Sequence, residues 1–523
     1  MDLQLELRLD RRTDEMNLEA RIPAEILSEI FHLLCDEPIA LEKLENSLCF
    51  DGFPWAVGQV CLRWRTTFLS HPPLWTSLSL HNPSGNRSAA HFAEMNRRSA
   101  IYLKRSGQLP LALTVSISSD TPILTTWKTL VSCSNRWRSA DIELPTGTAI
   151  DNALLECRGR IPILESLKIC QSGLERMGCY NVFEIAPHLT KLDLELYNGW
   201  TGTSIRFPWA QLTTLGLTLS YVSPGFAASD NELRAFLLQL QNVEELHFAI
   251  DFDSSHGDFK FPPVRLTRLR SLDLSVGLAS FVFSWFELPL LERLWLDYQY
   301  LDEDGLAPES EACGKELLSL VDRSSCRIRQ LILESCCDGR AHTIMKTLAS
   351  VEEFYIVDLV QLSGIVRDIA DSDGCIYLPK MRALHVKCCP GHFGMLVADL
   401  SHLLKVRSKE STVLSTLDTA PLESLTIRVD WGNCVEPCCV PNRSESRTQV
   451  DGALQAMSSW PSFSLTNVHR NQSNKRSVTL KVHALAAGTL IDLTLYYPNW
   501  DNRFIEEHRR CHSVLDNMRA IVI

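Results

Sequence analysis

Three cysteines that lie close together, Cys434, Cys438 and Cys439, are the densest group of residues able to bind a metal ion. A structural zinc site requires four ligands, which usually come in two closely spaced pairs. No fourth ligand is evident near these cysteines, because His469 lies far along a polar stretch. The sequence therefore predicts exposed or loosely packed thiols here and no metal site.

Other catalytic and ion-binding motifs are also missing from the sequence. The acidic stretches 302–305 and 371–374 begin like calcium-binding loops, but neither continues with the ligand pattern and the terminal Glu of such a loop. The chain has no glycine-rich phosphate loop, no Gly-x-Ser-x-Gly and no His-Glu-x-x-His. Its carboxylates and histidines are scattered. We therefore expect a protein that is not an enzyme and that uses no cofactor.

Composition limits the class of partner. The chain has 523 residues, of which 45% are hydrophobic, so it can bury a sizeable core. The net charge of -12 and the absence of clustered Lys and Arg argue against nucleic acid as a partner. No apolar run reaches the ~20 residues that span a membrane, and residues 1–20 lack the apolar segment of a secretory signal. We expect a cytoplasmic and/or nuclear protein whose 18 cysteines are mostly reduced.

The elements near the N-terminus are two short amphipathic helices. Pro23 suits a first helical turn, and it is followed by apolar residues at helical spacing, namely Ile26, Leu27, Ile30, Phe31 and Leu34. A second apolar stripe ends at Pro72-Pro73 and contains Val57, Val60, Cys61, Trp64 and Phe68. A unit this small needs its apolar faces covered by the rest of the chain or by a partner.

These segments resemble the F-box of the large fungal (basidiomycete-type) F-box families. The resemblance rests on three blocks in the right order: Ile-Pro-x-Glu-Ile-Leu-x-x-Ile-Phe from residue 22, Val-Cys-x-x-Trp-Arg from residue 60, and Pro-x-Leu-Trp from residue 72. The loop over residues 35–54 is longer than in a compact F-box. The resemblance implies docking on the Skp adaptor, and through it on a cullin-RING ubiquitin ligase. The residues implied to form or support this surface are Ile22, Pro23, Ile26, Leu27, Ile30, Phe31, Val60, Trp64, Leu74 and Trp75.

A repeated pattern fills most of the remaining chain. The spacing hydrophobe-x-x-hydrophobe-x-hydrophobe occurs thirteen times, from Trp75/Leu78/Leu80 to Leu490/Leu493/Leu495. The central residues between Leu167 and Leu294 lie 22 to 31 positions apart, close to the period of leucine-rich repeats. Each copy predicts a short strand whose two last hydrophobes point inward. The expected fold is α/β, with a short helical F-box followed by an irregular leucine-rich-repeat solenoid, or horseshoe.

The repeats are irregular, and the intervening segments include helices. We expect helices over 89–105, 315–323 and 395–406, and a strand over 109–118. The Asn that usually follows the repeat strand is not maintained, which predicts a flatter horseshoe. The expected organisation is an N-terminal tail (1–20), an F-box-like domain (21–80), a transition helix and strand (81–135), irregular leucine-rich repeats (136–430), a polar inserted loop (431–477), and a terminal repeat with a helical cap (478–523).

The residues between the inward hydrophobes would line the concave face of such repeats. Trp295 and Tyr355 stand out, because large exposed aromatic residues are enriched in binding interfaces; packing against a neighbouring side chain is the competing explanation. The residues proposed to bind a substrate are Asp193, Glu195, His247, Asp273, Trp295, Asp297, Tyr355, His385, Lys387 and Arg428.

Together these features predict the substrate-recognition subunit of a Skp-cullin-F-box (SCF) ubiquitin ligase, which holds an unidentified substrate protein while other subunits perform catalysis. The alternative is a leucine-rich-repeat scaffold for protein binding with no ubiquitin-ligase role. In that case the apolar faces of the N-terminal helices would be folded against the first repeats rather than exposed to a partner.

Overall fold

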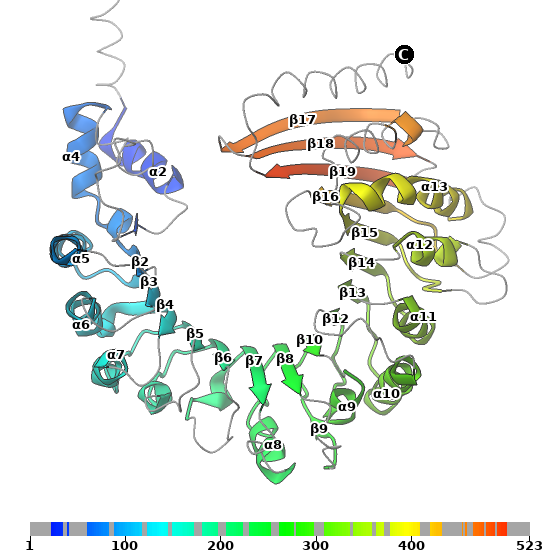
Figure 1. The fold of residues 1–523 in the computed structure, drawn as a ribbon, viewed down its shortest axis with the longest axis horizontal. Coiled ribbons are helices and arrows are strands. Elements are labelled where there is room, and N and C mark those ends of the chain that lie inside the picture. Colours follow the sequence, from blue (N-terminus) through cyan, green and yellow to red (C-terminus); the bar gives the residue numbers. More distant parts are fainter. Residues whose placement is uncertain are drawn as a thin grey trace, which may run out of the picture. The chain divides into compact units, whose positions relative to one another are not determined.

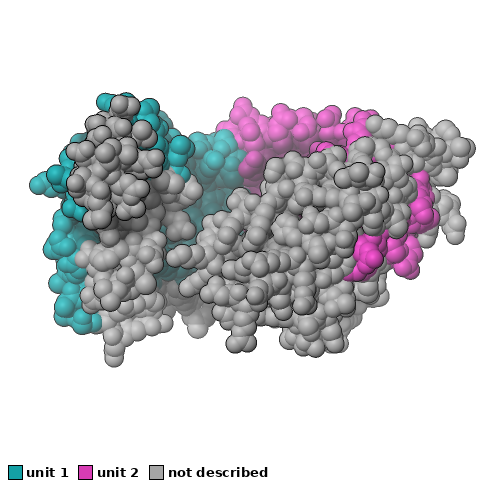
Figure 2. Space-filling view, turned by 90° about the horizontal axis from the view of Figure 1, so that it is seen from above, with its two compact units in different colours: residues 1–232 teal, residues 233–523 magenta. Residues whose placement is uncertain are grey.

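The computed structural model describes residues 22–34, 39–40, 60–82, 88–117, 123–144, 149–171, 180–196, 206–222, 230–252, 261–276, 279–297, 308–334, 338–357, 362–370, 377–407, 419–430, 452, 455–457, 464–474, 477–486 and 489–498. They belong to two compact units, Met1–Glu232 (unit 1) and Leu233–Ile523 (unit 2), which Figure 2 colours separately. Several expected features lie outside the described residues: the N-terminal tail, most of the 35–54 loop, the cysteines at 434, 438 and 439, the two acidic stretches, and the part of the expected helical cap beyond residue 498.

Unit 1 begins with the helices expected from the F-box-like blocks. Helix α2 (Ala24–Leu34) starts after Pro23, whose carbonyl accepts the amide hydrogen of Leu27 at 3.1 Å. Helix α4 (Leu62–Ser70) is capped by Cys61, whose sulfur accepts from the backbone N of Trp64 at 3.4 Å. The two prolines then start the 3-10 turn η1 (Pro72–Trp75). Because α4 begins at Leu62, after its N-cap Cys61, it is shorter than the apolar stripe from Val57 predicts.

The sheet of unit 1 is parallel, and its strands follow one another in chain order (Figure 1). They are β2 (Ser77–Asn82), β3 (Leu111–Ile117), β4 (Trp137–Leu144), β5 (Ser166–Gln171), β6 (Lys191–Leu196) and β7 (Thr214–Val222), with β1 (Ile39–Ala40) paired to β2. One face is covered by α5 (Ala89–Arg105), α6 (Leu124–Ser132) and α7 (Ala149–Leu154) (Figure 1). The segments between the strands also contain the 3-10 turns η2 (Ser134–Arg136), η3 (Leu155–Cys157), η4 (Tyr180–Glu184) and η5 (Trp209–Gln211).

The central hydrophobes of the repeated pattern lie opposite one another across this sheet. The row is Leu78, Leu113, Ala140, Leu167, Leu192 and Leu215, and all six are buried. Leu113, in the strand expected upstream of the repeats, belongs to the same row. The residue on either side of each points to the opposite face, which no described helix covers, because side chains alternate along a strand. We call that surface the open face of the unit.

Unit 2 continues the same construction. Its parallel strands are β8 (Glu245–Phe252), β10 (Ser271–Val276), β12 (Arg293–Asp297), β13 (Gln330–Glu334), β14 (Glu353–Val357), β15 (Ala383–Cys388), β16 (Ser424–Asp430) and β19 (Thr489–Pro498). The helices, which lie on one side of this sheet in Figure 1, are α8 (Asp230–Leu237), α9 (Ala279–Ser284), α10 (Pro308–Ser324), α11 (Asp338–Thr347), α12 (Leu362–Ala370) and α13 (Pro390–Val406). A separate small pair joins β9 (Val264–Arg265) to β11 (Phe286–Glu287).

The C-terminal part of unit 2 departs from the expectation in two places. Strand β19 pairs with β16 so that Ile491 lies opposite Leu425, and Leu490 is 50% exposed. The last copy of the pattern is therefore Ile491/Leu493, and its proposed first residue, Leu490, faces solvent. In addition, β17 (Ser464–Asn474) pairs antiparallel with β18 (Ser477–Ala486), which pairs antiparallel with β19. Residues 464–474 of the expected 431–477 loop thus form a strand. The hydrophobic pattern did not predict this strand, because its residues are mostly polar.

Arginines at the ends of helical segments donate hydrogen bonds to backbone carbonyls of neighbouring segments. Arg136 donates to the carbonyl of Leu109 at 2.9 Å, and Arg323 donates to the carbonyl of Phe286 at 2.7 Å. Arg407, which is 2% exposed, donates to the carbonyl of Tyr377 at 2.9 Å. Buried carbonyl groups need donors, and here the end of a helical segment supplies them.

Candidate protein-binding surfaces

The N-terminal helices share an aromatic core. Phe31 of α2 lies 5.4 Å from Trp64 and 6.3 Å from Phe68 of α4, measured between ring centroids, and Phe68 lies 5.1 Å from Trp75. Trp75 in turn lies 5.1 Å from Tyr102 of α5. Four of the residues implied to bind or support the Skp adaptor are therefore core residues, namely Leu27, Phe31, Leu74 and Trp75, each at most 3% exposed.

A second apolar face of α2 is exposed. Ile26 is 51%, Ile30 36% and Leu33 73% exposed, and the helical spacing of these three residues places them on one face. We call them the α2 apolar patch. Pro23 is exposed beside it at the start of the helix, and Val60 is 52% exposed before α4. Ile22 and Trp64 are partly exposed. The residues expected at one interface thus divide into a buried supporting face and an exposed face.

Polar contacts fix α2 and α4 to each other. The guanidinium of Arg63 donates a hydrogen bond to the backbone carbonyl of Ile22, which holds the start of α2 against α4. Burial lowers the pKa of His71 after α4, as does the nearby His32, while Glu29 acts in the opposite direction. The exposed face of α2 therefore belongs to a helix that is packed firmly against α4.

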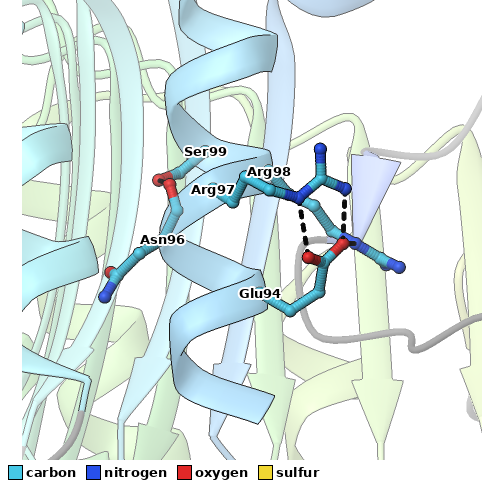
Figure 3. A network of polar contacts seen from close by, with 5 residues as sticks. All are labelled: Glu94, Asn96, Arg97, Arg98 and Ser99. Atoms are coloured by element: carbon cyan, nitrogen blue, oxygen red, sulfur yellow. Dashed lines mark hydrogen bonds and ion pairs between the residues drawn. The ribbon is translucent and has the colours of Figure 1, made fainter. Parts of the chain in front are cut away.

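Helix α5 contains the polar network shown in Figure 3. Glu94 accepts hydrogen bonds from Arg97 at 2.7 Å and from Arg98 at 2.9 Å, and these bonds lower the pKa of Glu94 to about 2. The hydroxyl of Thr126 in α6 donates to Asn96, so the network joins two neighbouring helices. Because Arg105 of α5 lies 4.5 Å from the ring centroid of Trp75, α5 also contacts the N-terminal aromatic core.

The open face of unit 1 brings together Asp193 and Glu195. The amino group of Lys168 lies 3.5 Å from Asp193 and 3.6 Å from Glu195. Burial raises the pKa of Asp141 on the next strand, and the carboxylates of Asp193 and Glu195 raise it further, against the effect of Lys168. Gly216 makes space for this cluster, because a Cβ at that position would lie 2.5 Å from Oδ1 of Asp193.

The open face of unit 2 carries the other eight residues proposed to bind a substrate. Paired positions on successive strands form one row: His247, Asp273, Trp295, Ile332, Tyr355 and His385. His247 Nδ1 lies 2.8 Å from Asp273 Oδ2, and the rings of Tyr355 and His385 stack with centroids 4.0 Å apart and planes at 10°. Trp295 and Tyr355 are partly exposed, and the neighbouring ring of His385 covers part of Tyr355.

The remaining charged residues of this set lie in the next row. Asp297 is paired with Glu334, a residue outside the proposed set, and Lys387 is paired with Arg428. Ile332 was also not in the set, although it occupies the same position between two inward hydrophobes as Trp295. Burial lowers the pKa of His385, and Glu353 opposes this effect; burial raises the pKa of Tyr355, and Glu353 adds to it.

The described residues contain neither a metal-binding cluster nor a membrane-spanning helix. Within them, no group of three or more His, Cys, Asp or Glu is placed to hold a metal ion. No described helix combines the length and the apolar character needed to cross a membrane. Cys388 and Cys389 are buried.

Comparisons with known proteins give no assignment. No protein-family model matches the chain, and a search of the curated proteins finds no match.

Proposed function

We propose that this chain is the substrate-recognition subunit of a Skp-cullin-F-box ubiquitin ligase, with an N-terminal F-box and an irregular leucine-rich-repeat solenoid. The observation that carries the proposal is the division of α2 into two faces. Leu27 and Phe31 pack in the aromatic core, whereas the α2 apolar patch, Ile26, Ile30 and Leu33, is exposed. Exposed aliphatic residues on a helix with a packed base are a typical docking surface for a partner protein.

The repeated strands support the proposed binding of a substrate protein. Short parallel strands in register, each followed by a helical or irregular return segment, are typical of leucine-rich repeats. The open faces of these strands carry charged and aromatic side chains suited to holding a substrate protein. The chain would supply proximity and orientation, with catalysis performed by other subunits in the cytoplasm or the nucleus.

A repeat scaffold with no ligase role is the alternative, and one contact favours it. Trp75 and Tyr102 pack together at 5.1 Å, so the N-terminal helices are partly folded against the first helix that follows β2. This contact uses the buried face of the helices and leaves the α2 apolar patch exposed. The two functions therefore differ in whether that patch binds the Skp adaptor.

Co-purification with the Skp adaptor tests the proposal. The full chain is expected to retain the adaptor, and Ile26→Asp/Ile30→Asp is expected to lose it, because both changes place charge on an exposed apolar face. Leu155→Asp/Leu318→Asp is the matched control, since those leucines are 46% and 47% exposed on other elements. Failure of the folded wild-type chain to retain the adaptor would favour the scaffold.

A further inference from the structure

Trp295, Ile332 and Tyr355 lie side by side on the open face of unit 2, where the two partly exposed rings flank Ile332, which is 7% exposed. We call these three residues the ledge. They come from adjacent strands β12, β13 and β14, and each is paired with the next. Neighbouring strands lie ~4.8 Å apart, so the side chains form one surface. The rings are held in place: Arg293 lies 6.0 Å from the centroid of Trp295, and Tyr355 stacks on His385.

Carboxylates surround the ledge. On the open faces of β8 to β14, the alternation of side chains places the acidic residues Glu245, Asp273, Asp297, Glu334 and Glu353. Within the described strands, the basic residues on these faces are Arg293 and His247, and His247 lies 2.8 Å from Asp273. Asp297 and Glu334 are direct partners on neighbouring strands, so their two negative charges lie close together, and Asp297 Oδ2 also accepts a hydrogen bond from Ser275 at 3.4 Å. The surroundings of the ledge therefore favour a positively charged ligand.

The charge changes sign at one end of the row. Lys387 and Arg428 are paired on β15 and β16, directly beyond Tyr355 and His385. A cationic ligand is thus favoured over β8 to β14 and disfavoured over the next two strands. This boundary limits the length of the cationic part of the ligand.

The geometry also limits how a ligand binds. Each strand from β10 to β15 is paired on both sides, so no backbone edge is available there, and recognition must use side chains. The row from Asp273 to His385 spans four strand steps, about 19 Å at ~4.8 Å each. An extended chain rises ~3.3 Å per residue, so about six residues cross this distance.

On the basis of the proposed function, we infer that the open face of unit 2 binds an extended segment of the substrate protein that carries Arg or Lys next to an apolar residue. The apolar residue packs between the rings of Trp295 and Tyr355, over Ile332, which is 7% exposed. The cationic side chains lie over the faces of Trp295 and Tyr355, beside Asp297, Glu334 and Glu353. Cations bind to aromatic faces, and Arg in particular stacks on them.

Fluorescence anisotropy with labelled eight-residue peptide pools tests this inference on the full chain. One pool alternates Arg or Lys with Leu or Phe, a second alternates Asp or Glu with Leu or Phe, and a third uses Ser or Asn. The cationic pool is expected to bind at least tenfold more tightly than either of the others. Equal binding of the acidic pool, or no binding of any pool, would overturn the inference.

Amino-acid substitutions test whether the cationic peptides bind at the ledge. Trp295→Ala and Tyr355→Ala are each expected to weaken the cationic pool about tenfold, and Trp295→Phe is expected to retain most of the binding. Asp297→Lys/Glu334→Lys is expected to abolish it. Glu156→Lys/Asp322→Lys makes the same change of charge at two exposed positions on a 3-10 turn and a helix, away from the strand faces, and is expected to leave binding intact. An equal loss in both charge variants would show nonspecific attraction and contradict the inference.

Folding and adaptor binding separate this inference from the proposed function. Each variant must keep the wild-type circular dichroism and its retention of the Skp adaptor, which involves α2 and not the ledge. Loss of peptide selectivity with intact adaptor binding overturns only the inference about the ledge. Loss of adaptor binding by the wild type overturns the ligase function, whatever the peptides do.

Discussion

Replacement of Arg407 tests the account of how the repeats are held together. Arg407 follows α13 and is 2% exposed. Its guanidinium donates to the carbonyls of Tyr377 at 2.9 Å and of Leu378, Pro379 and Ala420 at 3.4 Å each. Burial lowers its pKa to about 10, so the guanidinium is still charged near neutral pH. One side chain thus joins the end of a helix to two segments that precede strands.

These contacts determine how much the replacement of Arg407 should lower the free energy of unfolding. Arg407→Met keeps an apolar stem but removes every donor, which leaves buried carbonyls unsatisfied. A hydrogen bond from a charged donor contributes about 1.5–3 kcal/mol, and an unsatisfied buried group costs about 1–3 kcal/mol. The three longer contacts are weaker, and release of a buried charge offsets part of the loss. We expect Arg407→Met to lower the free energy of unfolding by about 2–4 kcal/mol.

Two assays measure the effect. Urea unfolding followed by circular dichroism gives the change in free energy. Hydrogen exchange is expected to accelerate at the amides of Ala420 and Leu422, which bond to Pro379 O at 2.7 Å and to Arg407 O at 2.9 Å. Arg382→Met is the control, because the Arg382 ion pair with Glu423 is exposed and is expected to contribute about 0–1 kcal/mol. Equal effects of the two variants, with unchanged exchange at Ala420 and Leu422, would refute the reasoning.

Three further predictions concern individual residues of unit 1. The folded pKa of Glu94 is depressed to about 2, below its ordinary 4.5. The stability gained from its bonds to Arg97 and Arg98 should therefore be present above about pH 4.5 and decline as the pH falls toward 2. Urea unfolding of wild type and Glu94→Gln from pH 3 to 7 should show that the difference in unfolding free energy shrinks below pH 4.5. Burial raises the pKa of the Cys157 thiol to about 12. Alkylation followed by mass spectrometry should therefore label Cys157 far more slowly than the partly exposed Cys61 and Cys133. Equal labelling rates would contradict the burial of Cys157. Gly216→Ala should destabilise the fold by about 1 kcal/mol through its clash with Asp193, and a double-mutant cycle with Asp193→Ala should recover most of that loss; additive effects would rule out the clash.

The hydrophobic spacing predicted the strands and their register well. Strand positions depend on a local alternation that one sequence displays, and so the rows through Leu167 and Leu272 could be aligned from the spacing of the hydrophobes alone. Helix α5 also agrees with its predicted bounds, Ala89–Arg105. The register of one strand was wrong near the C-terminal end, where Leu490 and Ile491 are both apolar and only the pairing with β16 shows which one is buried.

The candidate surfaces were predicted less completely. In α2, apolar residues occupy adjacent faces, so spacing alone could not show that Phe31 is buried while Ile30 is exposed. Ile332 was not predicted as a surface residue, since an apolar residue between two inward hydrophobes indicates burial, and the structure leaves only 7% of it exposed. The carbonyl-binding arginines were missed for a different reason, since Arg407 acts on segments separated from it in the sequence, and a local pattern carries no signal of such contacts.

The affinity of the full chain for the purified Skp adaptor tests the central claim most directly. Isothermal titration should show binding by the wild type, a loss of at least thirtyfold in Ile26→Asp/Ile30→Asp, and an unchanged affinity in Leu155→Asp/Leu318→Asp. Absence of binding by the folded wild-type chain, or an affinity that the change at the α2 apolar patch leaves unaltered, would contradict the assignment of this patch as the adaptor-binding surface.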